Sequence, residues 1–320
     1  MNKLFSIIIP CYNVKGYADK LFESLKPTSQ YDVEIILIDD CSPDGSYQVL
    51  QELFSNSGYA KVYQTEKNGG PGLARNQGIL KATGDYLIFV DSDDIFDFSF
   101  LSKAESFIKE HQDADLILSP YMRIRRKKKE IIDSYQKYKD QEEVDKQTII
   151  LGSMVPFAKV FKKAIIDKYQ LLFPNRFFGE DECFITYFTI HMTKAYKLDD
   201  VYYSYICNSS SITHRKDTTQ DKTTVYEDLK PVYEQYFPEV LTTKFVESHL
   251  LGKAKFMYTT GVSNKEMKKW FEIENKKIPG WFNQKNIGMN GTYRKLIYKA
   301  MYKNHPFRIK MLLKIRAILN

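Results

Sequence analysis

The sequence predicts an α/β protein, in which a doubly wound, mostly parallel sheet is flanked by helices and followed by a helical C-terminal region. Short apolar runs alternate with segments of helical periodicity through the first half of the chain, which is the order of β-α-β units. These runs are apolar at nearly every position, as in strands that are buried on both faces of a sheet. We expect two domains, a catalytic domain at residues 1–215 and a helical, basic region at residues 216–320.

The expected strands are short and rich in β-branched or aromatic residues, which favour strands. Pro10 follows the first of them, FSIII, and is expected to end it, because proline has no backbone N–H to donate within a sheet. The turn-forming segments SPDG and NGGPG follow the second and third strands. The expected strands are residues 5–9, 33–38, 61–64, 86–90, 114–121 and 201–206.

Helices are expected between these strands, where apolar residues recur three or four positions apart. Tyr17, Leu21 and Leu25 show this spacing in the first helix. Residues 123–146 carry many charges instead, and we expect them to form a solvated hairpin and loop. The expected helices are residues 14–25, 46–54, 73–82, 96–111 and 182–193.

Polar residues gather where successive strands end. Tyr12 follows the first strand, Asp39 the second, residues 68–72 the third, and Asp91 and Asp93 the fourth. Sheets of this class bind ligands outside the carboxyl ends of their strands. The shared placement therefore predicts one ligand site at that edge of the sheet.

The acidic cluster DSDD after the fourth strand indicates a metal site. Asp91 and Asp93 share one face of an extended segment, because side chains alternate along a strand. Crowded carboxylates repel one another unless a cation neutralises them. Oxygen ligands suit Mg²⁺ or Mn²⁺, and these ions often hold a substrate phosphate as well. The alternative is an acidic turn that binds nothing, because a D-x-D pattern is short.

Charge and motifs exclude several classes of protein. The 320 residues carry a formal net charge of +7, but residues 275–320 hold eleven basic residues and no acidic ones, so the body of the chain is net acidic. This distribution argues against a nucleic-acid-binding protein. Neither G-x-G-x-x-G nor G-x-x-x-x-G-K-[ST] is present, which argues against a dinucleotide reductase and P-loop chemistry.

Cysteine usage and hydropathy indicate a cytoplasmic protein. The four cysteines are scattered, without a C-x-x-C pair, which fits reduced thiols and argues against a zinc site. The apolar run after the N-terminus is short and lacks a cleavage site, so we expect no signal peptide. No apolar stretch approaches the ~18 residues of a membrane span.

Five motifs, in order and at ordinary spacings, carry a family resemblance: SIIIPCYN, EIILIDDCSPDGS, NGGPGLARNQGI, GDYLIFVDSDD and FFGEDECF. Over about residues 3–215, the chain resembles the family 2 glycosyltransferases of the GT-A fold, the bacterial group that builds capsules, exopolysaccharides and cell-wall glycans. Many members carry an arginine in the stretch that reads YYSYICNSSSIT here. Tyr205 and Ile206 stand near that place, so a basic contact to the donor phosphates is missing or comes from His214 or Arg215.

The resemblance implies a role for each matching residue. Tyr12 would pack on the nucleotide base, and Asp39 would accept a hydrogen bond from the uracil N3–H, which implies a UDP-sugar donor. Asp91 would contact the ribose or sugar, Asp93 would bind the metal, and Asp91 and His214 are further candidate ligands. The expected donor and nucleotide site is Pro10, Tyr12, Asn13, Asp39, Gly72, Arg75, Asp91, Ser92 and Asp93.

The resemblance also implies that Asp181 is the catalytic base, with Glu180 as its neighbour. An acceptor hydroxyl is a poor nucleophile, so a carboxylate should take its proton, and attack opposite the leaving group inverts the anomeric carbon. The simpler alternative is that both residues cap a helix, whose dipole favours negative charge at its start. The alternative enzyme is a metal-dependent nucleotidyltransferase or phosphohydrolase using the same Asp cluster, and a binding protein with a degenerate site is a third reading.

The C-terminal region is expected to be helical, serving either as a cap on the catalytic domain or as part of the acceptor site. Near its end, apolar residues at helical spacing stand among lysines and arginines, and they are Leu296, Ile297, Ala300, Met301, Phe307, Met311, Leu312, Ile315, Ile318 and Leu319. A basic amphipathic helix can lie in a membrane interface. We expect attachment to the inner face of the cell membrane, where a lipid-linked glycan acceptor would be found. The alternative is packing on the protein or on a second subunit in a homodimer.

Overall fold

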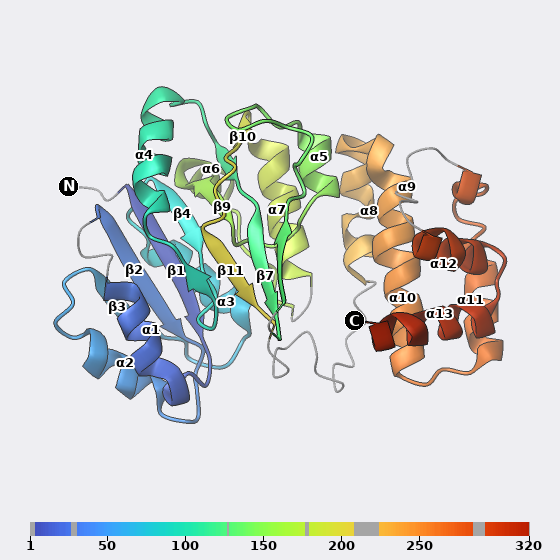
Figure 1. Cartoon of the computed structure of the whole chain (residues 1–320), viewed down its shortest axis with the longest axis horizontal. Coiled ribbons are helices and arrows are strands. Elements are labelled where there is room, and N and C mark those ends of the chain that lie inside the picture. Colours follow the sequence, from blue (N-terminus) through green and yellow to red (C-terminus); the bar gives the residue numbers. More distant parts are fainter. Residues whose placement is uncertain are drawn as a thin grey trace. The chain divides into compact units, whose positions relative to one another are not determined.

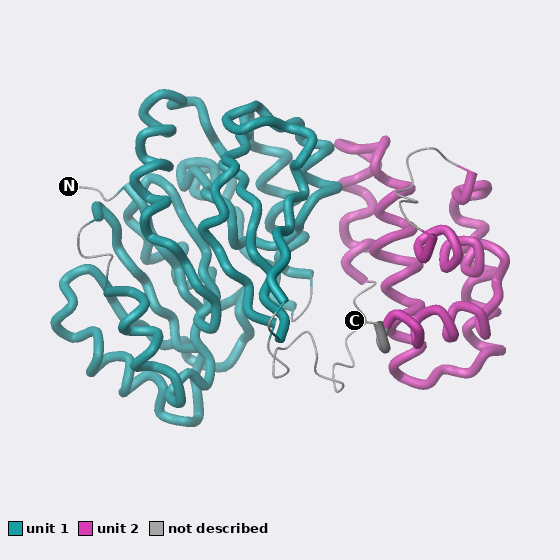
Figure 2. Tube along the Cα trace, viewed as in Figure 1, with its two compact units in different colours: residues 1–213 teal, residues 214–320 magenta. Residues whose placement is uncertain are grey.

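The computed structural model describes residues 4–26, 31–126, 128–176, 179–207, 224–283 and 292–319, without the side chains of residues 317–319. The chain forms two compact units, residues 1–213 and 214–320 (Figure 2), and each is described by itself. The boundary between them falls within residues 208–223, outside the described residues. Among the described residues, no helix combines the length and apolarity needed to span a bilayer.

The first unit is built on a seven-stranded sheet in the order β10-β6-β9-β4-β1-β2-β3 (Figure 1). All neighbours are parallel except β9, which runs antiparallel to both β4 and β6. The predicted α/β class with a mostly parallel sheet is thus confirmed. The strands are β1 (Phe5–Cys11), β2 (Val33–Asp39), β3 (Ala60–Gln64), β4 (Tyr86–Phe89), β6 (Leu116–Leu118), β9 (Lys159–Lys162) and β10 (Ala195–Lys197).

Alternation along the strands sends side chains into two separate cores. Ile7 and Ile9 of β1 belong to one core with residues of α1, α2 and α4, while Ile8 belongs to the other with residues of α3, α6 and α7. Both faces of the sheet are therefore covered, which explains why the strands are apolar throughout. The helices of this unit are α1 (Ala18–Leu25), α2 (Ser46–Phe54), α3 (Pro71–Lys81), α4 (Phe100–Glu110), α5 (Lys146–Leu151), α6 (Lys163–Tyr169) and α7 (Glu180–His191).

A second, four-stranded sheet has the order β5-β11-β7-β8. It consists of β5 (Ile95–Phe96), β7 (Tyr121–Arg125), β8 (Lys128–Ile132) and β11 (Tyr203–Ile206). β7 and β8 form the antiparallel hairpin expected in the charged segment. The strand expected at residues 114–121 is divided between β6 of the large sheet and the start of β7.

The expectation that Pro10 ends the first strand is wrong, because β1 continues to Cys11. Ile8 accepts a backbone hydrogen bond from Val90, which follows β4, and Cys11 accepts one from Asp40 on the β2 side. Backbone groups alternate between the two neighbours, so the missing N–H of Pro10 faces β4 beyond its last paired residue. No ladder bond is lost there, and this is where a sheet tolerates proline.

The second unit is helical (Figure 1), and α10, α11 and α12 all contact α13. Its core holds large aromatic side chains such as Trp281, Tyr298 and Phe245, all fully buried. Ile297, Ala300 and Met301 of the expected basic stripe are buried as well, so this part of the stripe packs within the unit. The helices are α8 (Thr224–Tyr236), η4 (Pro238–Val240), α9 (Leu241–Lys244), the π-helical turn η5 (Phe245–Leu250), α10 (Leu251–Thr259), α11 (Asn264–Glu274), η6 (Trp281–Asn283), α12 (Thr292–Tyr302) and α13 (Pro306–Leu319).

Candidate active site

The carboxyl ends of β1, β2 and β4 bring together residues that lie far apart in the sequence. These strands are parallel neighbours, and Cys11 pairs with Asp39 at the end of β1 and β2. The acidic cluster follows β4. Arg75 lies just beyond the first turn of α3, and Asp181 lies in the first turn of α7. The ion pairs from Arg75 to both acidic segments join them at this edge of the sheet.

Asp39 presents one carboxylate oxygen without a partner. The residue is fully buried, and its Oδ2 accepts hydrogen bonds from the backbone N–H of Ser42 and the Nε2 of Gln64, both at 3.0 Å. Its Oδ1 is buried and has no hydrogen-bond partner. A buried acceptor without a donor is costly, so this oxygen is suited to a ligand N–H.

The next residue, Asp40, has a structural role instead. Its carboxylate accepts hydrogen bonds from the backbone N–H groups of Gly69 and Gly70, the latter at 2.7 Å, and from the hydroxyl of Thr65. It therefore fixes the NGGPG loop that leads into α3. This division between the two aspartates was not evident from the sequence.

The loop after β1 leaves Tyr12 exposed and is held in place by hydrogen bonds. Tyr12 is 37% exposed, and Asn13 has a φ of 56°, in the left-handed region that asparagine tolerates. The backbone N–H of Asn13 donates to Ser42 Oγ at 2.9 Å, which ties the β1 exit to the β2 exit. On the other side, Ser92 Oγ and Tyr17 Oη share a hydrogen bond at 3.2 Å.

Arg75 connects the acidic cluster to α7. Its Nη2 lies 2.8 Å from Asp91 Oδ1, and its Nη1 lies 3.0 Å from Asp181 Oδ1. The guanidinium is buried and lies over the Phe173 ring, 5.4 Å from its centroid. Although burial opposes the charge, Asp181, Asp91 and Glu180 raise the pKa of Arg75. Asp91 and Asp181, which were predicted for different parts of the site, thus share one buried cation.

Gly72 allows α3 and α7 to approach each other closely. A Cβ at this position would lie 3.1 Å from Glu180 Cγ and 3.2 Å from Phe173 Cβ. Asn76, one turn further along α3, makes two 2.8 Å hydrogen bonds with the backbone N–H and C=O of Phe173. These contacts set the path of the chain that leads into α7, and the role of Asn76 was missed from the sequence.

Glu180 and Asp181 lie in the first turn of α7, two residues earlier than the expected start of this helix. Burial, followed by the charge of Asp181, raises the pKa of Glu180 to about 8. Burial also raises the pKa of Asp181 to about 6, with Arg75 opposing the increase. A carboxylate whose pKa approaches neutrality is a better proton acceptor than an ordinary aspartate. The raised pKa values fit a proton acceptor, while the place of both residues in the first turn of α7 is also that of helix-capping carboxylates.

Lys159 of β9 is a second buried basic residue at this site. Its Nζ donates to the Val155 carbonyl at 2.8 Å, and the residue is only 2% exposed. Burial lowers the pKa of Lys159 to about 7, and the negative charge of Asp181 opposes this. Lys159 was not predicted from the sequence, because its strand is neither long nor apolar throughout.

Asp94, the third carboxylate of the cluster, is hydrogen-bonded to β11. It accepts hydrogen bonds from Tyr203 Oη at 2.5 Å and from the backbone N–H of Ile206 at 2.7 Å. Tyr203 Oη also accepts from the backbone N–H of Asp91 at 3.1 Å. Burial and the charge of Asp91 raise the pKa of Asp94 to about 8. Asp94 thus anchors the acidic loop to the second sheet.

The remaining carboxylates fit a hard divalent cation. Asp91 is half-buried and Asp93 is exposed, on either side of Ser92 at the end of β4. Their oxygen donors suit Mg²⁺ or Mn²⁺. His214, the third predicted ligand, lies outside the described residues. In phosphate-binding sites, Mg²⁺ is usually held by one or two carboxylates and by oxygens of the substrate phosphates.

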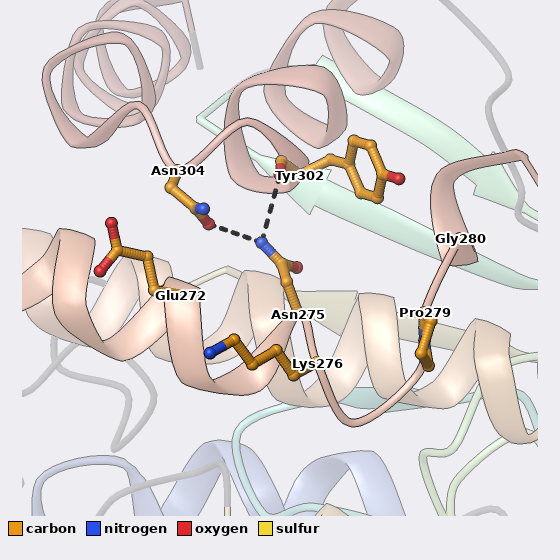
Figure 3. Close-up of a pocket in the computed structure, with 7 residues that line it drawn as sticks. All are labelled: Glu272, Asn275, Lys276, Pro279, Gly280, Tyr302 and Asn304. Atoms are coloured by element: carbon orange, nitrogen blue, oxygen red, sulfur yellow. Dashed lines mark hydrogen bonds between the residues drawn. The ribbon is translucent and has the colours of Figure 1, made fainter.

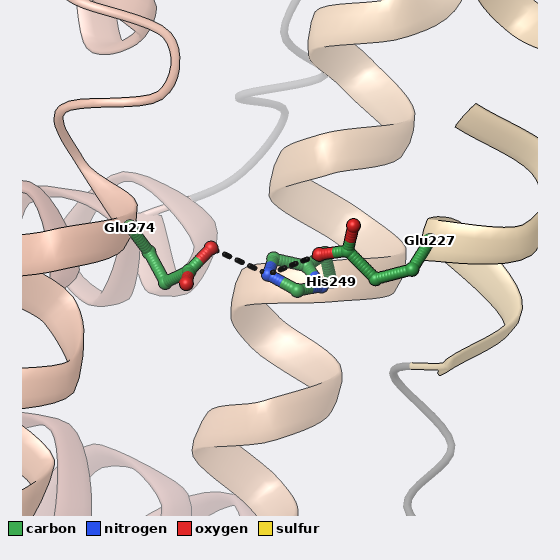
Figure 4. Close-up of side chains that lie close together, drawn as sticks. All are labelled: Glu227, His249 and Glu274. Carbon is green, nitrogen blue, oxygen red and sulfur yellow. Dashed lines mark hydrogen bonds and ion pairs between the residues drawn. The ribbon is translucent and has the colours of Figure 1, made fainter. Parts of the chain in front are cut away.

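The described residues contain one group of three potential metal ligands, and it lies in the second unit. Figure 4 shows His249 of η5 between Glu227 of α8 and Glu274 of α11. Its Nε2 lies 2.8 Å from Glu274 and 3.5 Å from Glu227. Lys277 Nζ lies 2.8 Å from Glu274 and 3.4 Å from Glu227, so one ammonium already pairs with both carboxylates. We interpret this group as an ion-pair network that joins three helical segments.

A hollow of about 660 Å³ also lies in the second unit (Figure 3), lined by Glu272, Asn275, Lys276, Pro279, Gly280, Tyr302 and Asn304. Asn275 Nδ2 donates to the Met301 carbonyl at 3.0 Å and to Asn304 Oδ1 at 2.6 Å, and its Oδ1 accepts from Trp281 Nε1 at 2.7 Å. Asn275 therefore joins the end of α11 to the end of α12. Both polar atoms of the Asn275 side chain are engaged in hydrogen bonds within the unit.

Comparison with known proteins identifies the family of this chain. The family model of "Glycosyl transferase family 2" matches residues 6–170, about half of the chain. The poly(ribitol-phosphate) β-N-acetylglucosaminyltransferase TarS of Staphylococcus aureus is 29% identical over 211 residues, which cover 63% of this chain and 35% of that protein. A poly(ribitol-phosphate) β-glucosyltransferase of Bacillus spizizenii is 31% identical over 190 residues, covering 56% of this chain and 28% of that protein.

Solved structures show the same fold. The crystal structure of S. aureus TarS residues 1–349 superposes with a TM-score of 0.69 at 22% identity, covering 99% of this chain and 92% of that one. A second structure, of TarS with UDP-GlcNAc, gives a TM-score of 0.67. The expected GT-A fold with a helical C-terminal region is confirmed. Because the family model matches residues 6–170, the chain belongs to glycosyl transferase family 2.

Proposed function

We propose that the protein is an inverting, metal-dependent glycosyltransferase that moves a sugar from a UDP-sugar to a hydroxyl of a glycan acceptor in the synthesis of a surface polysaccharide. The observation that carries the proposal is the buried Arg75, which joins Asp91 of the acidic cluster to Asp181 of α7. This contact puts a candidate proton acceptor beside the expected donor site. The family assignment and the two named relatives support the same reaction class.

The donor assignment is supported by Asp39. Its unpartnered, buried Oδ1 suits the N3–H of uracil, while Ser42 and Gln64 hold the other oxygen in place. Cytosine carries no hydrogen at N3, so this acceptor favours uracil. Tyr12 stands exposed at the adjoining β1 exit, where a base can stack on its ring. TarS, with the same fold, has been solved with UDP and with UDP-GlcNAc.

Asp91 and Asp93 would hold the Mn²⁺ or Mg²⁺ ion. A bound divalent ion supplies Lewis-acid stabilisation to the diphosphate leaving group. A mannosyltransferase of Pyrobaculum calidifontis, solved with GDP-mannose and Mn²⁺, has a related fold with a TM-score of 0.52. Asp94 keeps the loop in place through β11, and Arg75 fixes the Asp91 carboxylate.

Asp181 would act as the general base, with Glu180 beside it. The acceptor oxygen forms a bond to the anomeric carbon, the bond from that carbon to the diphosphate oxygen breaks, and the acceptor proton passes to Asp181. Attack opposite the leaving group inverts the anomeric centre. Arg75 and Lys159 favour the charged form of Asp181 against its burial, so that it can accept the proton near neutral pH.

The proposal also covers the acceptor and the cellular surface at which the enzyme acts. We propose a lipid-linked glycan acceptor at the cytoplasmic face of the cell membrane, with the basic second unit bringing the enzyme to that surface. The names of the two relatives specify poly(ribitol-phosphate), a polymer that, like a glycan, offers hydroxyl groups. The alternative is that the same basic segment packs on a second copy of the chain in a homodimer.

The test is UDP release from a panel of UDP-sugars, beginning with UDP-GlcNAc and UDP-glucose, with Mn²⁺ or with EDTA. We expect slow hydrolysis of one donor, abolished by EDTA and by Asp93→Ala. Asp181→Asn should still bind UDP but should not respond to an added acceptor. Release of pyrophosphate instead of UDP would favour the alternative, a metal-dependent nucleotidyltransferase. Absence of both turnover and binding with every UDP-sugar would overturn the donor assignment.

A further inference from the structure

Helix α13 of the second unit has two apolar faces, and one of them faces outward. Phe307, Met311 and Ile315 recur every four residues and are 71%, 44% and 42% exposed. Ile309, Leu312 and Leu313 are buried within the unit. Since successive residues of a helix are about 100° apart, the three exposed side chains fall within an arc of about 80° on the side away from the buried ones. The inward face alone explains how α13 packs.

Basic residues border this apolar stripe on both sides. By the same helical geometry, Lys310 and Lys314 lie along one edge and Arg308 along the other. Lys310 Nζ donates to the Val262 carbonyl, which ties its ammonium to the loop between α10 and α11. Residues 275–320 contain no Asp or Glu, so nothing in this segment balances these cations. We call the set of Phe307, Arg308, Lys310, Met311, Lys314 and Ile315 the outer face of α13.

We infer that the outer face of α13 docks on an anionic lipid bilayer. A central apolar stripe with cationic edges matches an interface in which acyl chains lie beneath negative headgroups. A second copy of the chain is a poor occupant, because a two-fold contact would set the same cations against one another. The side chains of Ile318 and Leu319, which extend the expected stripe, lie outside the described part of the structure.

The inference rests on the proposed function, whose membrane attachment it deepens, and it narrows the sequence-based expectation to one helix face. Of the expected stripe on α12, Ile297, Ala300 and Met301 pack inward and Leu296 alone is exposed, so the inference rests on the exposed stripe of α13. Peripheral binding through one helix face predicts a reversible association. Each neutralised cation should weaken binding about fivefold at low salt, which is the usual contribution of a lysine or arginine near an anionic surface.

The experiment is co-sedimentation of the full chain with sucrose-loaded vesicles, without donor or acceptor. Phosphatidylcholine vesicles are compared with equal mixtures of phosphatidylcholine and phosphatidylglycerol, at about 0.1 M and about 0.5 M NaCl. The test variant is Phe307→Ser/Met311→Ser/Ile315→Ser. The matched control, Leu80→Ser/Ile131→Ser/Ile273→Ser, removes three side chains that are 67%, 57% and 53% exposed on other elements.

We expect wild type and control to pellet with the anionic vesicles and to be released by high salt, and we expect the stripe variant to bind at least about tenfold more weakly. Circular dichroism of each variant checks that it is folded. Brominated lipid should quench the fluorescence of a Phe307→Trp variant more than that of an Ile273→Trp variant. Equal quenching, or equal binding of the stripe variant, would overturn the inference.

Two further outcomes would also overturn it. Failure of the wild type to bind anionic vesicles would do so directly, and a dimer that the stripe variant loses in analytical ultracentrifugation would assign the face to a second copy. Because none of these measurements uses catalysis, the inference fails or stands independently of UDP release. A chain that binds vesicles without releasing UDP would contradict the proposed function alone.

Discussion

Replacing Arg75 with glutamine should move the acidic limb of the pH–rate profile. In the wild type, the rate should fall as the pH drops through about 6, because Asp181 becomes protonated there and can no longer accept a proton. Arg75 favours the charged carboxylate across a 3.0 Å contact. Without this cation, Asp181 should be protonated at a higher pH, and the limb should move upward.

The size of the change follows from the geometry. Two unit charges 3.0 Å apart interact by about 1.4 kcal/mol at the dielectric constant of water and by about 5.5 kcal/mol at an effective value of about 20. At about 1.36 kcal/mol for each pH unit, this corresponds to about 1 to 4 units. The Asp181 side chain keeps 29% of its exposure, and solvent screens the contact. We therefore expect the lower half of this range, about 1 to 2 pH units.

The assay is UDP release with saturating donor, acceptor and Mg²⁺ between about pH 5 and pH 9. Arg75→Lys should move the limb less, because it keeps one charge but loses the fork that bridges two carboxylates. Lys81→Gln, on the same helix but outside the site, should leave the limb in place. If Arg75→Gln lowers the rate while its limb coincides with that of the wild type, Arg75 acts on the donor only and the reasoning fails.

Three other predictions concern the support of the site. Gly78→Ala should destabilise the fold by about 1–3 kcal/mol, because its Cβ would lie 2.3 Å from Ile8 Cγ2; an unchanged melting temperature would contradict this. Tyr203→Phe removes the hydroxyl that holds Asp94 and should raise the Mg²⁺ concentration for half-maximal activity about tenfold or more, whereas an unchanged metal requirement would assign that hydroxyl to stability alone. Asp39→Asn should weaken UDP binding by about 10- to 100-fold in calorimetry, and wild-type affinity would exclude the uracil contact.

The sequence predicted the parts of the fold that rest on local pattern. Continuous apolar runs identified β1, β2 and β4. The turn-forming residues of SPDG and NGGPG located the loops that lead into α2 and α3. The ends of parallel strands meet at one edge, so the gathering of Asp39 and Asp91 followed without coordinates. The position of Asp181 depended on the family resemblance, because nothing local distinguishes it from a helix cap.

The rest depended on contacts between distant segments. The assignment of β9 to the middle of the sheet could not be read from KVFK, which is short and begins and ends with lysine. The roles of Lys159 and Asp94 follow from burial against other elements, and such burial is absent from the pattern of either segment. Similarly, α12 and α13 have the same basic, apolar sequence character, and only their packing distinguishes the buried stripe from the exposed one.

The place of β9 in the large sheet has a consequence for how the chain is made. β4 pairs with β1 on one side and with β9 on the other, and β9 lies about seventy residues later in the sequence. While the ribosome is still adding those residues, one edge of β4 is apolar and unpaired, and such an edge invites pairing with other chains. A fragment that ends before Lys159 keeps this exposed edge permanently. Expression of the first unit alone should therefore extend through β9, β10 and β11, and shorter pieces should aggregate.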